Sequence, residues 1–129
     1  MCIRDRAGTL SGNPLATAAG VSVLRRLRDP AVYEELERRG ARLEEGLVPY
    51  GLVQRVGAML TLFLRGIDPL TVVTRMERLE TDRYAALFRH LLAEGVYVAP
   101  SQYECLFPSL AHGDEEIDAT VAAVGSFAG

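Results

Sequence analysis

The sequence predicts an α+β fold in which an antiparallel sheet packs on helices, and three observations support this prediction. Several segments place apolar residues at the spacing of an α-helix. One stretch, residues 52–65, instead shows the two-residue alternation that is typical of strands. The chain has 129 residues, of which 49% are hydrophobic and 24% charged, and this is enough for one ordinary core.

Two helices are predicted in the first third of the chain. Asn13 is a natural N-cap before a proline, so we expect a helix of small residues over positions 14–28. The Asp-Pro pair at 29–30 repeats this start signal and predicts an amphipathic helix that ends at Gly46 or near Pro49. The Glu and Arg residues of this second helix are interpreted as a solvated face. Its apolar stripe consists of Val32, Leu36, Leu43 and Leu47.

The middle of the chain is expected to contain the strands. Within residues 52–65 the leucines alternate with other side chains on either side of a bend at Gly57, which predicts two strands. Residues 68–80 begin with a third Asp-Pro pair and carry a weaker apolar series, which predicts a short helix. The leucines of the alternating series are Leu60, Leu62 and Leu64.

The last third is predicted to hold two helices separated by short strands. Apolar residues at helical spacing over 84–92 predict a helix, and Gly95 supplies its stop. We expect short strands at 96–100 and 106–110, with an irregular polar loop between them. The final helix follows the sequence GDEE, with Gly113 or Asp114 as its cap. This order of elements completes the α+β prediction.

Composition excludes several classes of function. A net charge of −3 gives no basic surface for nucleic acid or anionic lipid, so neither partner is expected. No apolar run approaches the roughly 20 residues of a membrane span, which predicts a cytoplasmic protein. No metal site is expected, because the cysteines and histidines lack the spacing of metal ligands. These residues are Cys2, Cys105, His90 and His112.

The basic residues are all arginine, 14 in number, and the chain contains no lysine. An arginine side chain stays protonated and does not form a Schiff base with a carbonyl compound. Any carbonyl or pyridoxal chemistry that needs a lysine amine must therefore take that lysine from another part of a protein.

The first candidate site is the loop GTLSGNP at residues 8–14. It is not a P-loop, because it has no lysine and does not follow a predicted strand. Its backbone N–H groups, the hydroxyls of Thr9 and Ser11 and the positive end of the following helix suit an oxyanion or a phosphate. An ordinary capped helix start explains the same residues and is the interpretation that the residues alone favour.

The second candidate is Glu104, a lone carboxylate in the loop between Pro100 and Pro108. Its apolar flanks predict partial burial, and a partly buried carboxylate without a basic neighbour often binds a cationic ligand. A solvated surface carboxylate is the alternative. Tyr103, Cys105 and His112 have weaker claims, because nothing marks them as more than packing residues.

Three stretches, GTLSGNPLATAAG, EGVYVAPSQYECLFPSLAH and GDEEID, resemble the C-terminal part of the glutamate-1-semialdehyde 2,1-aminomutases, which are pyridoxal-phosphate enzymes similar to class III aminotransferases. The resemblance covers residues 7–128 and departs from the family pattern at Cys105 and Leu106. It implies the small C-terminal α+β domain of a fold-type I enzyme over 29–129, preceded by a cofactor-phosphate loop and a long interdomain helix over 7–28. Residues 1–6 match nothing in the family and are expected to be non-native.

The resemblance also implies a function. The parent enzyme would convert glutamate-1-semialdehyde to 5-aminolevulinate for tetrapyrrole synthesis, with pyridoxal 5'-phosphate as cofactor. Gly8 and Thr9 would bind the cofactor phosphate of the neighbouring subunit in a homodimer, and Glu104 would lie near the amino group of the substrate. The family's Schiff-base lysine belongs to the large cofactor domain, which is missing here, so the chain holds no catalytic residue of its own and should be inactive alone. Alternatives are another class III aminotransferase, acting on ω- or β-amino acids, and a non-catalytic dimerisation domain.

Overall fold

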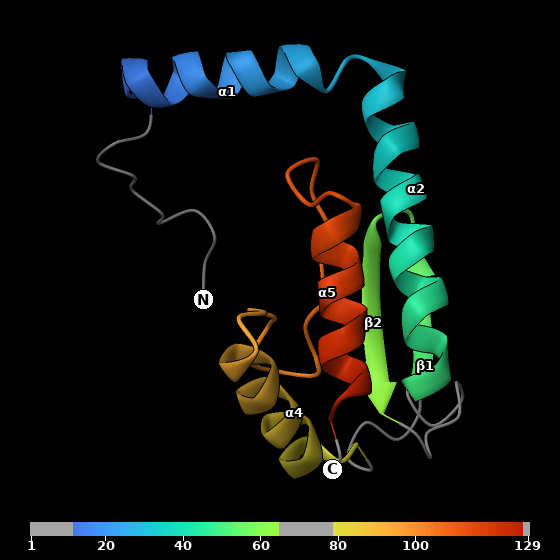
Figure 1. Cartoon of the computed structure of the whole chain (residues 1–129). Helices are drawn as coiled ribbons and strands as arrows, with labels where there is room; N and C mark the ends of the chain where they lie inside the picture. The colour runs from blue at the N-terminus through green and yellow to red at the C-terminus, as the bar shows by residue number, and fades with distance from the viewer. Residues whose placement is uncertain (1–11, 65–78, 128–129) are drawn as a thin grey trace. The chain divides into compact units, whose positions relative to one another are not determined.

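The computed structural model describes residues 12–64 and 79–127 (Figure 1). The chain divides into two compact units, one up to Tyr33 and one from Glu34 onward. The described helices are α1 (Pro14–Arg26), α2 (Pro30–Leu47), α4 (Thr81–Ala93) and α5 (Asp114–Gly125), and the strands are β1 (Gly51–Val56) and β2 (Met59–Leu64). The predicted α+β class, with an antiparallel strand pair and helices, is confirmed.

Helix α1 begins where the sequence predicts. The side-chain oxygen of Asn13 accepts hydrogen bonds from the N–H groups of Leu15 (2.9 Å) and Ala16 (3.3 Å), and its backbone carbonyl accepts from Thr17 (2.9 Å). This is the N-cap arrangement, in which the cap satisfies N–H groups that have no partner within the helix. The helix ends at Arg26, two residues before the predicted end.

Helix α2 also starts at its predicted cap. The Asp29 carboxylate accepts a hydrogen bond from the N–H of Ala31 at 3.0 Å. The helix runs through Gly46 to Leu47, and a turn of 3-10 helix follows at Val48–Tyr50. The proline inside this turn has no N–H to continue the helical pattern, so the proline region ends the helix and the glycine does not.

The two strands form a hairpin whose register pairs Val56 with Met59. The two-residue turn between them contains Gly57 at a φ of +60°, a conformation that side chains other than glycine rarely adopt. The predicted bend at this position is confirmed. Leu60, Leu62 and Leu64 share one face of β2 and are all buried, because successive side chains of a strand alternate between its two faces.

The core lies between this face of the hairpin and the helices of the second unit. In Figure 1, α2 and α5 run side by side in front of the two strands. The opposite face of β2 carries Phe63, which packs with Leu79 and the partly buried Leu52. The buried helical residues of the main core are Leu43, Leu47, Tyr84, Leu87, Leu91, Ile117, Ala123 and Val124.

A close approach joins α2 to the turn of the hairpin. Gly40 is buried on α2, and a Cβ atom there would lie 2.7 Å from the carbonyl oxygen of Gly57. Arg55 strengthens the same contact, because its guanidinium lies 2.6 Å from a carboxylate oxygen of Glu37 and 2.6 Å from one of Glu44. The same guanidinium donates to the Gly57 carbonyl at 2.7 Å.

Helix α4 ends at Ala93, and Gly95, whose φ is +82°, follows its C-cap Glu94 as the predicted stop. The N–H of Gly95 donates to the carbonyl of Leu92 (3.2 Å), and the N–H of Val96 donates to that of Leu91 (2.8 Å). This pair of bonds is the Schellman motif, which satisfies carbonyl groups at a helix C-terminus.

The two short strands predicted after α4 are wrong. Residues 96–100 are irregular, because the N–H of Val96 closes α4 and the carbonyl of Ala99 accepts a hydrogen bond from the Tyr84 hydroxyl. The strand predicted at 106–110 reduces to a single bridge between Leu60 and Leu106. The helix predicted at 68–80 lies outside the described residues except for its last two positions, which are not helical.

Within residues 12–64 and 79–127, no helix is long and apolar enough to cross a membrane.

Candidate functional site

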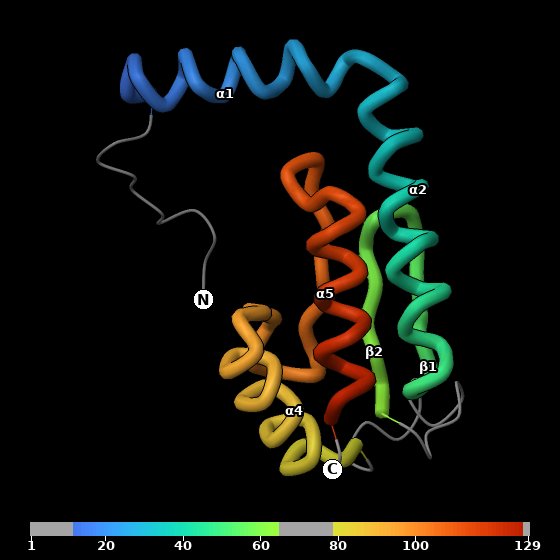
Figure 2. Tube along the Cα trace, viewed as in Figure 1, coloured from blue at the N-terminus to red at the C-terminus, as the bar shows by residue number. Residues whose placement is uncertain are grey.

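The loop of residues 99–106, which carries Glu104, is fixed at both ends. At its start, the Tyr84 hydroxyl of α4 donates to the carbonyl of Ala99 at 2.9 Å. At its end, Leu106 and Leu60 of β2 exchange two backbone hydrogen bonds, of 2.7 and 3.1 Å. Figure 2 traces this connection in orange, from the end of α4 to the start of α5. The loop therefore joins a helix and a strand of the same core.

Inside the loop the backbone turns sharply. The N–H of Glu104 donates to the carbonyl of Ser101 (3.1 Å), and the N–H of Tyr103 donates to the Ser101 hydroxyl (3.2 Å). Gln102 is only 2% exposed, and its amide nitrogen and oxygen have no hydrogen-bond partner in the described part of the chain. The side chain that the turn buries is thus Gln102.

The prediction that Glu104 is partly buried is wrong, because this residue is exposed. Its apolar neighbours Cys105 and Leu106 are half-buried in its place. The described residues offer Glu104 no ion-pair partner. An exposed carboxylate without a basic neighbour is available to a cation from outside the chain.

The negative charge of Glu104 affects the pKa of the buried Tyr84 hydroxyl. Burial raises the pKa of Tyr84, and the negative charge of Glu104 raises it further. Both residues line a small cavity of about 20 Å³, together with Val98 and Leu106. A cavity of this size holds about one water molecule. Tyr84, which fixes the start of the loop, and Glu104 inside the loop therefore border the same cavity.

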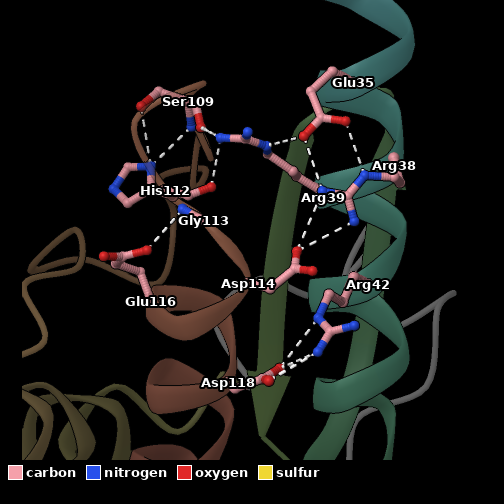
Figure 3. Close-up of polar contacts among 10 residues, drawn as sticks. All are labelled: Glu35, Arg38, Arg39, Arg42, Ser109, His112, Gly113, Asp114, Glu116 and Asp118. Atoms are coloured by element: carbon pink, nitrogen blue, oxygen red, sulfur yellow. Dashed lines mark hydrogen bonds and ion pairs between the residues drawn. The ribbon is translucent and has the colours of Figure 1, made fainter.

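The segment after the loop is fastened to α2 by arginine (Figure 3). Arg39 donates to the carbonyl groups of Ser109 (3.0 Å) and His112 (2.6 Å), and its Nε lies 2.6 Å from the Glu35 carboxylate. Hydrogen bonds from Arg38 and Arg39 lower the pKa of the Glu35 carboxyl from 4.5 to about 2. The interpretation of these charges as a solvated face is incomplete, because the Arg39 side chain is only 13% exposed.

Further polar contacts join α5 to the same helix and order its start. Arg42 contacts both carboxylate oxygens of Asp118 at 2.8 Å, a geometry that suits the planar guanidinium. His112 Nδ1 accepts a hydrogen bond from the N–H of Ser109 at 2.9 Å, and the Glu116 carboxylate accepts one from the N–H of Gly113 at 2.7 Å. His112 therefore orders the turn before α5.

Gly8 and Thr9 lie outside the described residues, so their contact with a phosphate stays a prediction. The helix that follows them is described, and its first turn is already satisfied. Pro14 has no N–H, and Asn13 accepts from the next three N–H groups. An anion at this end of α1 would therefore depend on the loop before the helix rather than on the helix N-terminus.

The remaining candidates have structural partners. Cys105 is half-buried and accepts a hydrogen bond from the Thr61 hydroxyl at 3.5 Å. His90 Nε2 lies 3.0 Å from the Ala123 carbonyl and 3.0 Å from the Ser126 hydroxyl. Among the residues that the structure describes, no group of three or more His, Cys, Asp or Glu side chains is placed to hold a metal ion.

The fold of this chain is similar to that of part of a solved transaminase. The chain superimposes on part of the solved structure of an omega-transaminase from Sphaerobacter thermophilus with a TM-score of 0.73. The match covers 94% of this chain and 29% of that one, at 23% sequence identity, so it shows the fold alone. The α+β fold that the sequence predicts is confirmed by this match.

Sequence comparison relates the chain to the glutamate-1-semialdehyde 2,1-aminomutases, and the predicted resemblance is confirmed. It is 41% identical over 122 residues to the protein of this name from Alkaliphilus oremlandii and 46% identical over 125 residues to that from Thermomicrobium roseum. Each match covers 92% of this chain. The chain spans only 28–29% of the length of these two relatives. A comparison with protein-family models finds no match.

Proposed function

We propose that the chain is the C-terminal part of a pyridoxal-phosphate-dependent enzyme that converts glutamate-1-semialdehyde to 5-aminolevulinate for tetrapyrrole synthesis. The names of the relatives, at 41–47% identity over at least nine tenths of the chain, support this substrate. The observation that carries the proposal concerns Glu104, an exposed carboxylate that has no ion-pair partner among residues 12–64 and 79–127 and lies in a loop that is fixed at both ends. A carboxylate held in this way suits a substrate that carries an ammonium group.

The residues of this chain fit a supporting role toward the cofactor. Without a lysine the chain cannot provide the side-chain amine that forms the Schiff base with pyridoxal 5'-phosphate, so that lysine would belong to a large domain outside it. Gly8 and Thr9 would hold the phosphate of the neighbouring subunit's cofactor with backbone N–H groups and a hydroxyl. The first turn of α1 is satisfied by Asn13, so this proposal does not depend on the N–H groups of that turn. When bound, the cofactor supplies the electron sink of the reaction.

Glu104 would act on the substrate. Its carboxylate accepts hydrogen bonds from the ammonium group and so orients the carbon atom that carries it. Charge-assisted hydrogen bonds are short and directional, so the position of the carboxylate decides which atoms face the cofactor. Since this orientation requires the cofactor-bearing domain, the chain should be inactive alone and active within a homodimer of the complete enzyme.

The test uses a full-length enzyme in which this chain replaces the matching part of the Thermomicrobium roseum relative. Glu104→Gln keeps the size of the side chain and removes its charge. Turnover of glutamate-1-semialdehyde should fall by about tenfold or more, since a hydrogen bond to a charged group contributes about 1.5–3 kcal/mol. The absorbance of the bound cofactor should persist, because Glu104 is not proposed to contact it.

Glu94→Gln is the matched control, because Glu94 is also exposed but lies at the C-cap of α4, away from the loop. This variant should keep full turnover. Equal turnover in the wild-type and Glu104→Gln enzymes would refute the role of Glu104. An enzyme that is active on ω-amino acids but not on glutamate-1-semialdehyde would refute the substrate.

A further inference from the structure

Among the described residues, one side-chain hydrogen bond from the core reaches the start of the Glu104 loop. Tyr84 is a core residue of α4, only 7% exposed, and its hydroxyl donates to the carbonyl of Ala99 at 2.9 Å. The next residue, Pro100, has no N–H with which to form a backbone hydrogen bond. The hydroxyl of Tyr84 therefore provides a polar contact that ties this end of the loop to α4.

Tyr84 and Glu104 are also coupled by charge. Both residues line the same cavity of about 20 Å³. Burial and the charge of Glu104 both raise the pKa of Tyr84, so the charge of one residue acts on the hydroxyl of the other. A loss of the hydroxyl would free the loop at a point five residues before Glu104.

We infer that Tyr84 is a positioning residue for Glu104, which holds the start of the loop so that the carboxylate meets the substrate's ammonium group. This inference rests on the function proposed above. It assigns to Tyr84 a role beyond packing, because a phenylalanine would fill the same core volume but leave the Ala99 carbonyl without this donor. Tyr84 acts through Glu104 and does not itself touch the substrate.

The test is a double-mutant cycle in the full-length holoenzyme described above. Tyr84→Phe should lower the turnover number about two- to tenfold, the range expected for the loss of one neutral hydrogen bond. In the Glu104→Gln background the same change should cause no further loss, because no carboxylate remains to be positioned. Cofactor absorbance should stay constant throughout. Tyr97→Phe is the matched control, since Tyr97 is exposed and lies outside the loop, and should leave turnover unchanged.

The outcomes separate the two proposals. An equal loss from Tyr84→Phe in both backgrounds, or no loss in either, would overturn the inference about Tyr84 alone. Full turnover in the Glu104→Gln enzyme would refute the function proposed for Glu104, and the positioning role would fall with it.

A second measurement does not require Tyr84→Phe to fold. The ionisation of Tyr84 is followed by NMR of ring-labelled tyrosine in the wild-type and Glu104→Gln holoenzymes. The pKa of Tyr84 should be lower in the variant, because a neighbouring negative charge has been removed. An unchanged Tyr84 pKa would show that the two side chains are not coupled and would overturn the inference.

Discussion

Gly40→Ala should destabilise the protein, although alanine is the better helix former. Gly40 lies inside α2, where alanine in place of glycine is normally favoured by about 0.8–1 kcal/mol. Here the added Cβ would lie 2.7 Å from the Gly57 carbonyl oxygen and 3.2 Å from the Cα of Ala58. Both are backbone atoms of a tight turn, so relief requires the hairpin to move away from the helix. Overpacking of this kind costs about 1–3 kcal/mol, which predicts a net loss of about 1 kcal/mol.

Gly46 on the same helix provides the comparison. A Cβ there would meet the methyl groups of Val121 on α5, and a side chain can shift more easily than a backbone. Gly46→Ala should therefore lower the free energy of unfolding less than Gly40→Ala does. In a protein that already carries Val121→Ala, Gly46→Ala should cause no further loss of stability. The assay is urea denaturation of each variant, followed by far-ultraviolet circular dichroism. An increase in stability on Gly40→Ala would refute the close packing of helix and turn.

Two further predictions concern buried and paired polar groups. Gln102→Met should raise the free energy of unfolding by about 1 kcal/mol, because a buried amide without a partner is costly and methionine has a similar shape; a loss of stability in urea denaturation would show that the amide has a partner. The pKa of Glu35 is lowered from 4.5 to about 2, so its ion pairs stabilise the fold above pH 5 and this contribution is lost as the pH falls from about 5 towards 2. Glu35→Gln should flatten this part of the stability profile, and an unchanged profile would contradict the assignment.

The sequence predicts best where local chemistry decides the structure. Asn13 and Asp29 cap their helices through contacts with residues two or three positions away, so the short sequence contains the whole signal. The turn at Gly57 is local in the same sense. Residues 96–100 look like a strand by composition, but their backbone groups bond to α4, which a two-residue alternation does not reveal.

In the candidate site too, local features could be predicted from the sequence, whereas contacts between distant residues could not. Glu104 could be singled out from its loop and from the family resemblance, but its exposure depends on a turn that buries Gln102 instead. The helical spacing of apolar residues over 84–92 predicts only that Tyr84 belongs to the apolar stripe of a helix. A tyrosine in such a stripe carries a hydroxyl that needs a partner when it is buried, and this was the available signal. The partner, Ala99, lies 15 residues along the chain and could not be identified from spacing.

The contacts at both ends of the Glu104 loop also explain how a loop can hold a carboxylate in a defined position. Ordering a free loop costs conformational entropy for each residue, and a mobile carboxylate would have to lose this entropy when the substrate binds. In this chain the folded core already imposes the order. Tyr84 fixes one end of the loop to α4, Leu60 fixes the other to β2, and Arg39 fastens the following segment to α2. The three contacts come from three separate elements of the core, and the loss of the Tyr84 contact alone would already release the start of the loop.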